Sequence, residues 1–334
     1  MSTPSGPTSV ERWLVLAEDL VGRAAPRLNA LNVFPVPDAD TGSNMLATLR
    51  AARAAAESAE TADVGAVMAR VGRAALDAAH GNSGTLLAVA LAGASGPLRG
   101  RREVRVADLA AAFGAADEAA RAALSEPQEG TILTVLTAAA ESLERSAAEA
   151  PSGTGEDSRL ADAVTAMVAG SLRAVEGTEA LLPTLADAHV VDAGAVGLLW
   201  VLEALRSAVT GTEVDAELAA ALHGYADESR EAVAAPAGHA AGVEVMGTLA
   251  LTPLDAAELR RRLDAVGDSL ILAPVSRELD EQGRVPWRVH VHVPRAEDAV
   301  DVLRAAGEPA GLSVTDLSAP AHAHRHEADG RHGR

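Results

Sequence analysis

The sequence predicts a two-domain protein, an all-α antiparallel helical barrel or bundle followed by a small α+β domain of βαββαβ order and ferredoxin-like type. The chain has 334 residues, which is long for a single domain. Hydrophobic residues make up 48% of it and aromatic residues only 2%, so the cores consist largely of Ala, Leu and Val, a composition that favours helix. Near residue 242 the spacing of apolar residues changes from a helical to a strand pattern.

The first domain, residues 1–224, is predicted to be helical throughout. Apolar residues recur at helical spacing in residues 10–20, and a further helix is expected to begin near Ser43. Later segments with the same spacing are 64–78, 84–91, 106–124, 132–143, 160–175 and 195–209. Breaks rich in Gly or Pro, such as 95–97 and 151–155, separate these helices.

The second domain is predicted to span residues 242–319, after a linker at 225–241 that contains Pro236 and has little periodicity. Its expected strands are 243–251, 269–275, 287–293 and 312–317, and its expected helices are 255–266 and 295–306. The tail at 320–334 is rich in His and is predicted to be disordered, with weak metal binding as the alternative.

The composition excludes several kinds of chemistry. A net charge of −19 argues against nucleic acid or an anionic membrane as the main partner. The chain has no Cys, so it has no disulfides, thiolate nucleophiles or Cys-based metal sites. It also has no Lys, so phosphate charge has to be met by metal ions, Arg and backbone N–H groups. Residues 1–7 lack the features of a signal peptide and no apolar run is long enough for stable membrane insertion, so a cytoplasmic protein is expected.

Asp38 and Asp40 are the first candidate functional residues. They lie two residues apart, behind two prolines that stiffen the loop and just before a predicted helix. Carboxylates at this spacing can converge on one hard cation, and with Asn32 close by the natural assignment is oxygen ligation of Mg²⁺. The alternative is a structural pair, because Asp is also a favoured helix cap.

Four predicted helices begin with short polar segments that contain Gly. Such starts present backbone N–H groups, taken to be unpaired at Gly42, Ser43 and Asn44, which can bind phosphate oxygens. The other starts are Gly81–Asn82–Ser83–Gly84, then Glu129–Gly130–Thr131, and Val191–Asp192–Ala193–Gly194. A single start of this kind is more often only a tight turn, but four of them indicate loops gathered at one end of a helical bundle.

The segment Asn32–Val33–Phe34–Pro35–Val36–Pro37–Asp38–Ala39–Asp40–Thr41–Gly42–Ser43–Asn44–Met45 resembles the signature of the fatty acid kinase ATP-binding subunit. The first domain of that subunit is similar to the L subunit of dihydroxyacetone kinase, called DhaL. His80–Gly81–Asn82–Ser83–Gly84, Glu129–Gly130–Thr131 and Val190–Val191–Asp192–Ala193–Gly194 resemble the next motifs in the same order. The resemblance covers residues 9–205 and extends less specifically to the second domain through 267–270 and 289–293.

The resemblance implies a barrel of antiparallel helices that binds ATP among the loops at one end, together with two Mg²⁺ ions. It implies that Asn32, Asp38 and Asp40 bind metal and that the two carboxylates are catalytic. Expected phosphate or nucleotide contacts are Gly42, Ser43, Asn44, Gly81, Asn82, Ser83, Gly84, Thr131 and Asp192.

The sequence departs from the family at three positions. Ala39 stands where Gly is common, which restricts the metal loop, and His80 replaces a usual Arg near the phosphates. In the second domain, Glu244 takes the position of a Cys that forms a zinc-like site with two His residues, here His290 and His292. This trio can hold Zn²⁺, and the alternative is a surface strand with alternating polar residues.

The expected activity is transfer of phosphate from ATP to the carboxylate of a fatty acid that a DegV-like fatty-acid-binding protein presents. A homodimer is a second expected assembly. The sequence ends after the middle domain, without the third domain of the family, so nucleotide binding is a firmer expectation than full kinase activity. The alternatives are a kinase for small ketones of the dihydroxyacetone type and a nucleotide-binding regulator or scaffold without catalysis.

Overall fold

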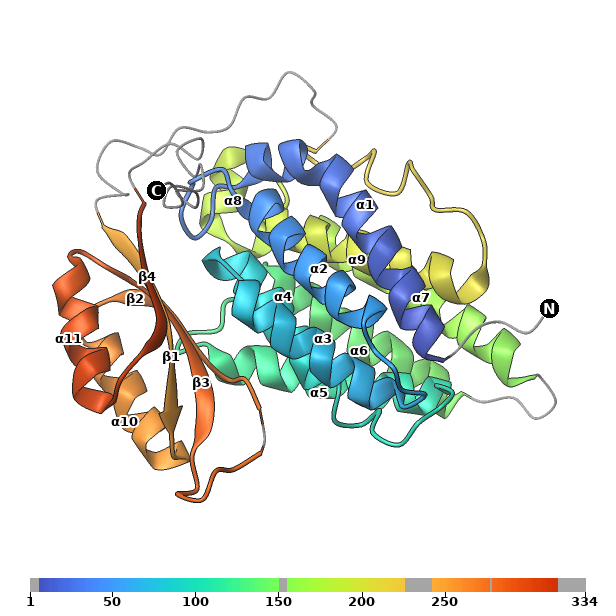
Figure 1. Ribbon diagram of the computed structural model, residues 1–334. Coiled ribbons are helices and arrows are strands. Elements are labelled where there is room, and N and C mark those ends of the chain that lie inside the picture. The colour runs from blue at the N-terminus through green and yellow to red at the C-terminus, as the bar shows by residue number, and fades with distance from the viewer. Residues whose placement is uncertain (1–5, 150–154, 226–241, 277, 318–334) are drawn as a thin grey trace, which may run out of the picture.

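The computed structural model of the chain describes residues 6–149, 155–225, 242–276 and 278–317 (Figure 1). The predicted tail lies outside these residues, as does the predicted linker except for its first residue. That residue, Tyr225, is buried, and its hydroxyl accepts a hydrogen bond of 3.1 Å from Trp200 Nε1. Tyr225 therefore packs with the helical part of the chain.

Within its described residues, the chain up to Tyr225 forms helices and no strand, as predicted. The helices are α1 (Pro7–Leu31), α2 (Thr41–Glu57), α3 (Val64–Ala78), α4 (Gly81–Gly93), α5 (Val106–Ala123), α6 (Ile132–Ala148), α7 (Glu156–Leu181), α8 (Pro183–Ala188) and α9 (Ala193–Thr210). The short helix α8 was not predicted. Helix α1 continues past Pro26 to Leu31, because its apolar residues remain buried beyond the proline.

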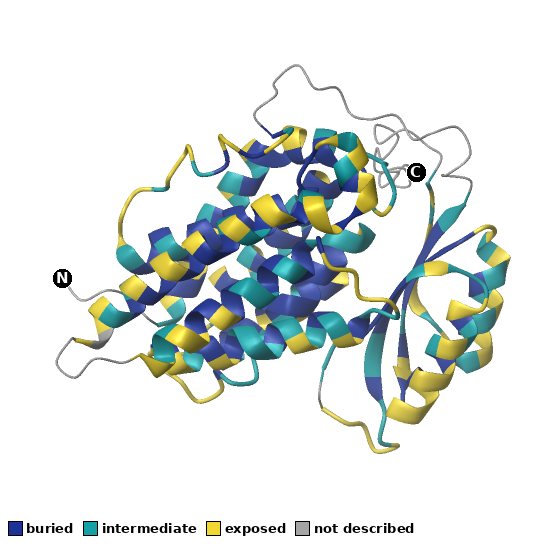
Figure 2. Ribbon diagram, turned by 180° about the vertical axis from the view of Figure 1, so that it is seen from behind, coloured by how far each residue is buried: buried dark blue, intermediate teal, exposed yellow. Residues whose placement is uncertain are grey.

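The long helices form a closed ring. Each of α1 to α7 packs against the next, α7 packs against α9, and α9 returns to pack against α1. Buried side chains line the faces of the helices that point inward, and exposed residues cover the outer faces (Figure 2). Large fully buried side chains such as Leu14, Leu28 and Leu199 fill this core. The prediction of an antiparallel helical barrel or bundle is thus confirmed.

Helix α9 explains why one apolar segment is long enough to cross a membrane. In the described part of the chain, Ala193–Thr210 is the one helix that meets the length and composition expected of a membrane span, and 89% of this window is buried. It packs against α1, α6 and α7 within the ring. Its apolar character on all sides is therefore that of a core helix.

The second domain has the predicted βαββαβ order. Its elements are β1 (Val243–Leu251), α10 (Pro253–Asp264), β2 (Asp268–Pro274), β3 (Val285–Val293), α11 (Ala296–Ala306) and β4 (Ala310–Asp316). The strands form one antiparallel sheet in the order β2-β3-β1-β4, which is the order of a ferredoxin-like fold.

The sheet is buried on both faces, and the alternation of strand residues decides which side chain faces which layer. Val289, Val291 and Val293 of β3 join the core beneath α10 and α11. Ile271 and Ala273 of β2 point the other way and belong to the core of the helical domain. In Figure 1 the sheet accordingly stands between its own two helices and the helical ring.

Polar contacts also join the domains. Arg260 of α10 donates to the carbonyl oxygens of Ala122 and Ala123 at the end of α5, at 2.9 and 3.2 Å. It thereby satisfies carbonyl groups that a helix end leaves without partners. Leu124 forms an isolated antiparallel bridge with Ile271. These contacts hold the sheet against the ring.

Candidate functional site

The loop between α1 and α2 brings Asn32, Asp38 and Asp40 together. Asn32 ends α1, and its Nδ2 donates a short hydrogen bond to Asp38 Oδ1. Asp40 lies at the position that precedes α2, but its side chain does not cap that helix. Between the two carboxylates, Ala39 has a φ of 57°, in the left-handed region that favours Gly. The predicted restriction at Ala39 therefore falls on the turn that joins the two carboxylates.

The two carboxylates carry charge that the protein does not neutralise well. Burial and the neighbouring charge of Asp40 raise the pKa of Asp38 to about 8. Burial also raises the pKa of Asp40, to which the charge of Glu244 contributes. A divalent cation would neutralise this charge, and carboxylate and amide oxygens are ligands that Mg²⁺ accepts. The residues present therefore fit the predicted metal, although their role as its ligands stays a prediction.

The start of α2 differs from the prediction in its backbone. The N–H groups of Gly42 and Ser43 were expected to be unpaired, but both donate to Asn29 Oδ1, at 2.8 and 3.2 Å. The N–H of Asn44 donates to the carbonyl of Asp40 at 2.9 Å, within the first turn. The expectation of free backbone donors here was therefore wrong, because a side chain of α1 already satisfies two of them.

Asn29 is thus a residue of the site that the sequence analysis missed. Its Nδ2 also donates to Ser43 Oγ at 3.0 Å, so the whole amide is engaged with the start of α2. A signal was present in the sequence, since Asn29 and Asn32 lie three residues apart at the end of one apolar helix. That spacing places two amides on the same side of the helix, next to the acidic loop.

The start of α4 lies against the start of α2. Ser83 Oγ donates to the carbonyl of Thr41 at 3.4 Å, and the backbone of Gly84 lies close to Asn44 and Thr48. Asn44 Nδ2 and Asn82 Oδ1 are both buried without a hydrogen-bond partner in the described residues. Because buried polar atoms are normally paired, these two amides are suited to bind a polar ligand at this position.

The first backbone donor of α4 is also occupied. The N–H of Gly81 donates to Glu244 Oε1 of the second domain at 2.9 Å. His80, which precedes Gly81, is exposed and its side chain does not cap the helix. The two domains therefore meet at the start of α4, beside the acidic loop.

The starts of α6 and α9 are neighbours of each other and of α2. Thr131 caps α6 by accepting from the N–H of Leu133 at 3.3 Å. A Cβ on Gly194 of α9 would lie 3.6 Å from Ile132, and one on Gly197 would lie 2.4 Å from Met45 of α2. The polar helix starts picked out in the sequence thus gather around the acidic loop.

Asp192 is the predicted nucleotide contact that the structure encloses most fully. It is 5% exposed, and one of its oxygens accepts from the N–H of Ala195 at 2.7 Å as the cap of α9. Burial raises its pKa to about 7, against the opposing effect of its backbone hydrogen bonds. Its contact with nucleotide stays a prediction, and its role as a helix cap is visible.

An Asp192→Asn substitution separates these two roles. The folded-state pKa of about 7 lies above the ordinary value of 3.8, so the free energy of unfolding falls as pH rises through this interval. The slope from this group is about 1.4 kcal/mol per pH unit. Asn caps helices as well as Asp does and does not titrate, so the variant should gain stability over wild type between pH 5 and pH 7.

Urea unfolding at several pH values measures this difference. A stability difference that does not change with pH would contradict the assignment of a raised pKa to Asp192. ATP titration of the same variant tests the other role, because a carboxylate that contacts nucleotide would lower affinity when replaced.

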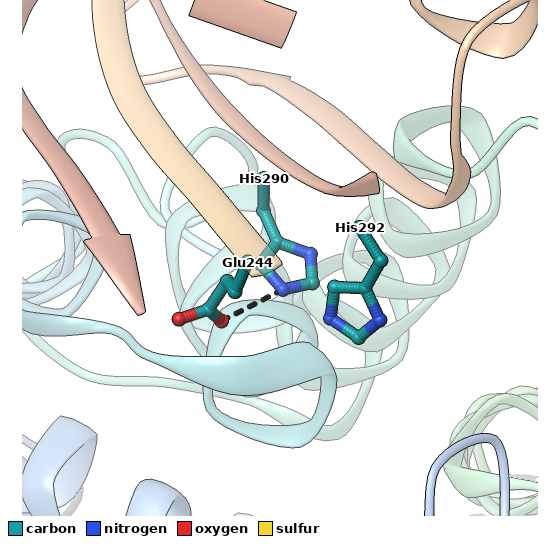
Figure 3. Close-up of side chains that lie close together, drawn as sticks. All are labelled: Glu244, His290 and His292. Carbon is teal, nitrogen blue, oxygen red and sulfur yellow. Dashed lines mark ion pairs between the residues drawn. The ribbon is translucent and has the colours of Figure 1, made fainter. Parts of the chain in front are cut away.

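A second cluster lies on the sheet face that meets the helical domain. Glu244 of β1 pairs across the sheet with His292 of β3, and His290 lies on the same face two residues earlier (Figure 3). Their ligand atoms all lie within 4.8 Å of one another, and Glu244, His290 and His292 are 5%, 0% and 6% exposed. The alternative of a surface strand with alternating polar residues was therefore wrong, because the helical domain covers this face.

The chemistry of the cluster fits a metal. His290 Nδ1 and His292 Nδ1 are buried without hydrogen-bond partners among the described residues. Burial, followed by the charge of His290, lowers the pKa of His292 to about 3, which leaves a neutral imidazole. Burial alone would raise the pKa of Glu244, but His290 and the Gly81 N–H outweigh it and lower the pKa to about 2. A carboxylate with two imidazoles is a donor set that Zn²⁺ accepts, so the group could hold a metal.

A closed ring of helices with an acidic loop among its helix starts, followed by a split βαβ domain, defines a class of two-domain protein with a nucleotide-type site. The chain belongs to the DAK2 domain family, which matches residues 35–207. Residues 242–324 match the middle domain of the FakA-like family of fatty acid kinase proteins. The predicted resemblance is thereby confirmed for both domains.

The chain is similar to several bacterial proteins. It is 30% identical to Protein YloV of Bacillus subtilis over 324 residues, which cover 94% of this chain and 56% of YloV. It is 32% identical over 193 residues to an uncharacterized protein of Staphylococcus epidermidis, and 35% identical over 195 residues to one of Staphylococcus aureus. Each staphylococcal match covers 58% of this chain and 34% of the relative. The chain thus spans about half the length of YloV and a third of the others.

Proposed function

We propose that the chain is an ATP-dependent phosphotransferase of the fatty acid kinase type that acts in the cytoplasm. The observation that carries this proposal is the pair of half-buried carboxylates, Asp38 and Asp40, beside the unpartnered amides of Asn44 and Asn82. Acidic oxygens for a cation and amides for a polar ligand then lie side by side at the ends of helices. Family membership supports the kinase class, and the fatty acid acceptor is the finer part of the proposal.

In this proposal each side chain has a definite task. Asp38 and Asp40 hold Mg²⁺, and Asn32 orients Asp38 through its hydrogen bond. Bound Mg²⁺ supplies positive charge that neutralises the phosphates in the transition state. Asn44 Nδ2 and the hydroxyl of Ser83 donate to phosphate oxygens and position the γ-phosphate. Because Asn29 occupies the first donors of α2, side-chain donors carry more of this task than the sequence analysis expected.

The proposed acceptor is the carboxylate of a fatty acid presented by a DegV-like binding protein. One carboxylate oxygen forms a bond to the γ-phosphorus while the bond to the β–γ bridging oxygen breaks, which yields an acyl phosphate and ADP. A fatty acid is ionised at neutral pH, so the acceptor needs no general base. This agrees with a site whose titratable side chains are mainly carboxylates suited to hold a cation.

Phosphoryl transfer with purified components tests the function. The chain is incubated with MgATP and a DegV-like protein loaded with a fatty acid, and ADP and acyl phosphate are measured. We expect formation of both products, dependent on the loaded partner. Transfer to small ketones instead would favour the dihydroxyacetone-type alternative, and MgATP binding without turnover would favour a regulator or scaffold.

A further inference from the structure

One carboxylate oxygen links the metal-type cluster of the second domain to the nucleotide-type site of the first. Glu244 Oε1 accepts the N–H of Gly81 at 2.9 Å, and the same atom lies 2.9 Å from His290 Nε2. In Figure 3 the trio accordingly lies directly over the ribbon of the helical domain. No other side-chain contact of Glu244 is needed to join the two sites.

The sequence leaves the start of α4 without a local cap, which explains why this contact exists. His80 makes no capping bond, and Gly81 adopts a φ of 59°, so its N–H is free to point at the second domain. An acidic group at a helix N-terminus is favoured by the helix dipole and by the orphan N–H groups. Glu244 supplies that group from 163 residues further along the chain.

The histidines are placed for a cation more than for each other. His290 Nε2 approaches Glu244 Oε1 without meeting the geometry of a hydrogen bond, and His290 Nδ1 also has no partner among the described residues. The two imidazole rings lie 4.9 Å apart at an interplanar angle of 72°. Ligand atoms around a tetrahedral zinc lie about 3.3 to 3.6 Å apart, so the trio is close to such an arrangement.

The charge of the cluster reaches the acidic loop. Glu244 disfavours ionisation of Asp40, whereas His290 favours it. Gly81 is also in close contact with the loop side, since a Cβ on Gly81 would lie 2.2 Å from Asn44 Nδ2. A change of charge or position at Glu244 is therefore felt by a carboxylate and by an amide of the nucleotide-type site.

We propose that a divalent cation held by Glu244, His290 and His292 and MgATP held by the first domain bind cooperatively, with Glu244 as the positioning residue that couples them. The inference rests on the proposed nucleotide site. Without the cation, the negative charge of Glu244 opposes the approach of phosphate. With the cation, that charge is compensated, and Glu244 is fixed while its oxygen still accepts the N–H of Gly81, as carboxylate ligands commonly do.

Thermodynamic linkage makes the proposal quantitative. If the cation tightens MgATP binding by some factor, MgATP must tighten cation binding by the same factor. We expect a factor of about 10, within the range of roughly 5 to 150 that is typical of coupled sites.

The test is MgATP titration by calorimetry on the full chain, in a zinc buffer at a fixed free concentration and in a zinc chelator. Three proteins are compared, wild type, His292→Ala and His189→Ala. His189 is exposed on the helical domain, so its replacement is the matched control. The His-rich tail is present in all three and contributes equally. Hydrogen exchange of the peptide around Gly81, with and without zinc, gives a second readout that needs no nucleotide.

The expected result is a Kd for MgATP that falls about 10-fold with zinc in wild type and in His189→Ala, and does not change in His292→Ala. Zinc should also slow exchange at the start of α4 in the same two proteins. Zinc that binds through His292 without changing either readout would overturn the coupling while the proposed function stands. Zinc that does not bind at the trio would also overturn it. Failure of every protein to bind MgATP would overturn the proposed function itself.

Discussion

Asp38→Ala is expected to lower the affinity for MgATP by at least about 100-fold, since loss of residues that merely support a ligand costs 10- to 100-fold. Asp38 is half-buried beside Asp40, and Asn32 donates to its carboxylate, so no neighbouring acid can take its place. The measurement is calorimetric titration of ATP with and without Mg²⁺. Asp40→Ala should give a loss of similar size.

The stability of Asp38→Ala distinguishes loss of a ligand from loss of the fold. Burial and Asp40 raise the pKa of Asp38 to about 8, so its ionised form is unfavourable in the folded protein. Removing it should not lower the thermal midpoint of the metal-free protein at pH 8. Asp19→Ala is the matched control, because Asp19 is exposed on α1 and pairs only with Arg23 among its described ion-pair contacts. Unchanged ATP affinity in Asp38→Ala would refute the assignment of the site.

Gly42→Ala is expected to destabilise the protein by about 3 kcal/mol, the cost of serious overpacking, and to weaken MgATP binding as well. A Cβ at this position would lie 2.6 Å from both the Cα and the carbonyl oxygen of Ala25 on α1. Both are backbone atoms, so no side chain can rotate away. Relief requires α2 to move from α1, which also breaks the bond from the Gly42 N–H to Asn29 and shifts Asp40.

The control for this prediction is Gly177→Ala. Gly177 is exposed in α7, and nothing lies within 4 Å of the Cβ that it lacks. Because Ala favours helix over Gly by about 1 kcal/mol, this variant should be more stable than wild type. Thermal unfolding of both variants measures the contrast. A Gly42→Ala protein as stable as Gly177→Ala would show that the two helices do not approach as closely as described.

Much of the fold could be predicted because apolar periodicity is a local property of the chain. Helical spacing in residues 10–20 and strand alternation in residues 287–293 each reflect which side of one element is buried. Element ends were less predictable, since tertiary burial extends α1 past Pro26 and holds α8 in place. The acidic loop was visible because its residues are neighbours in sequence.

The parts of the site that sequence reasoning missed depend on residues distant in the chain. Asn29 occupies the N–H groups of Gly42 and Ser43 only because α1 and α2 pack side by side. His290 and His292 read equally well as residues of an exposed strand, since alternation indicates a face but not what covers it. The contact of the helical domain with the sheet decided that question.

The sequence by itself determined the two-domain architecture, the acidic loop and the family to which the chain belongs. These follow from periodicity, composition and a run of contiguous residues, all of which are local. Only the tertiary structure decided that Glu244 reaches Gly81 across the domain interface and that Asp192 is enclosed as a helix cap. The physical reason is that hydrogen bonds and burial depend on which surfaces meet, and no local pattern specifies the relative placement of two domains.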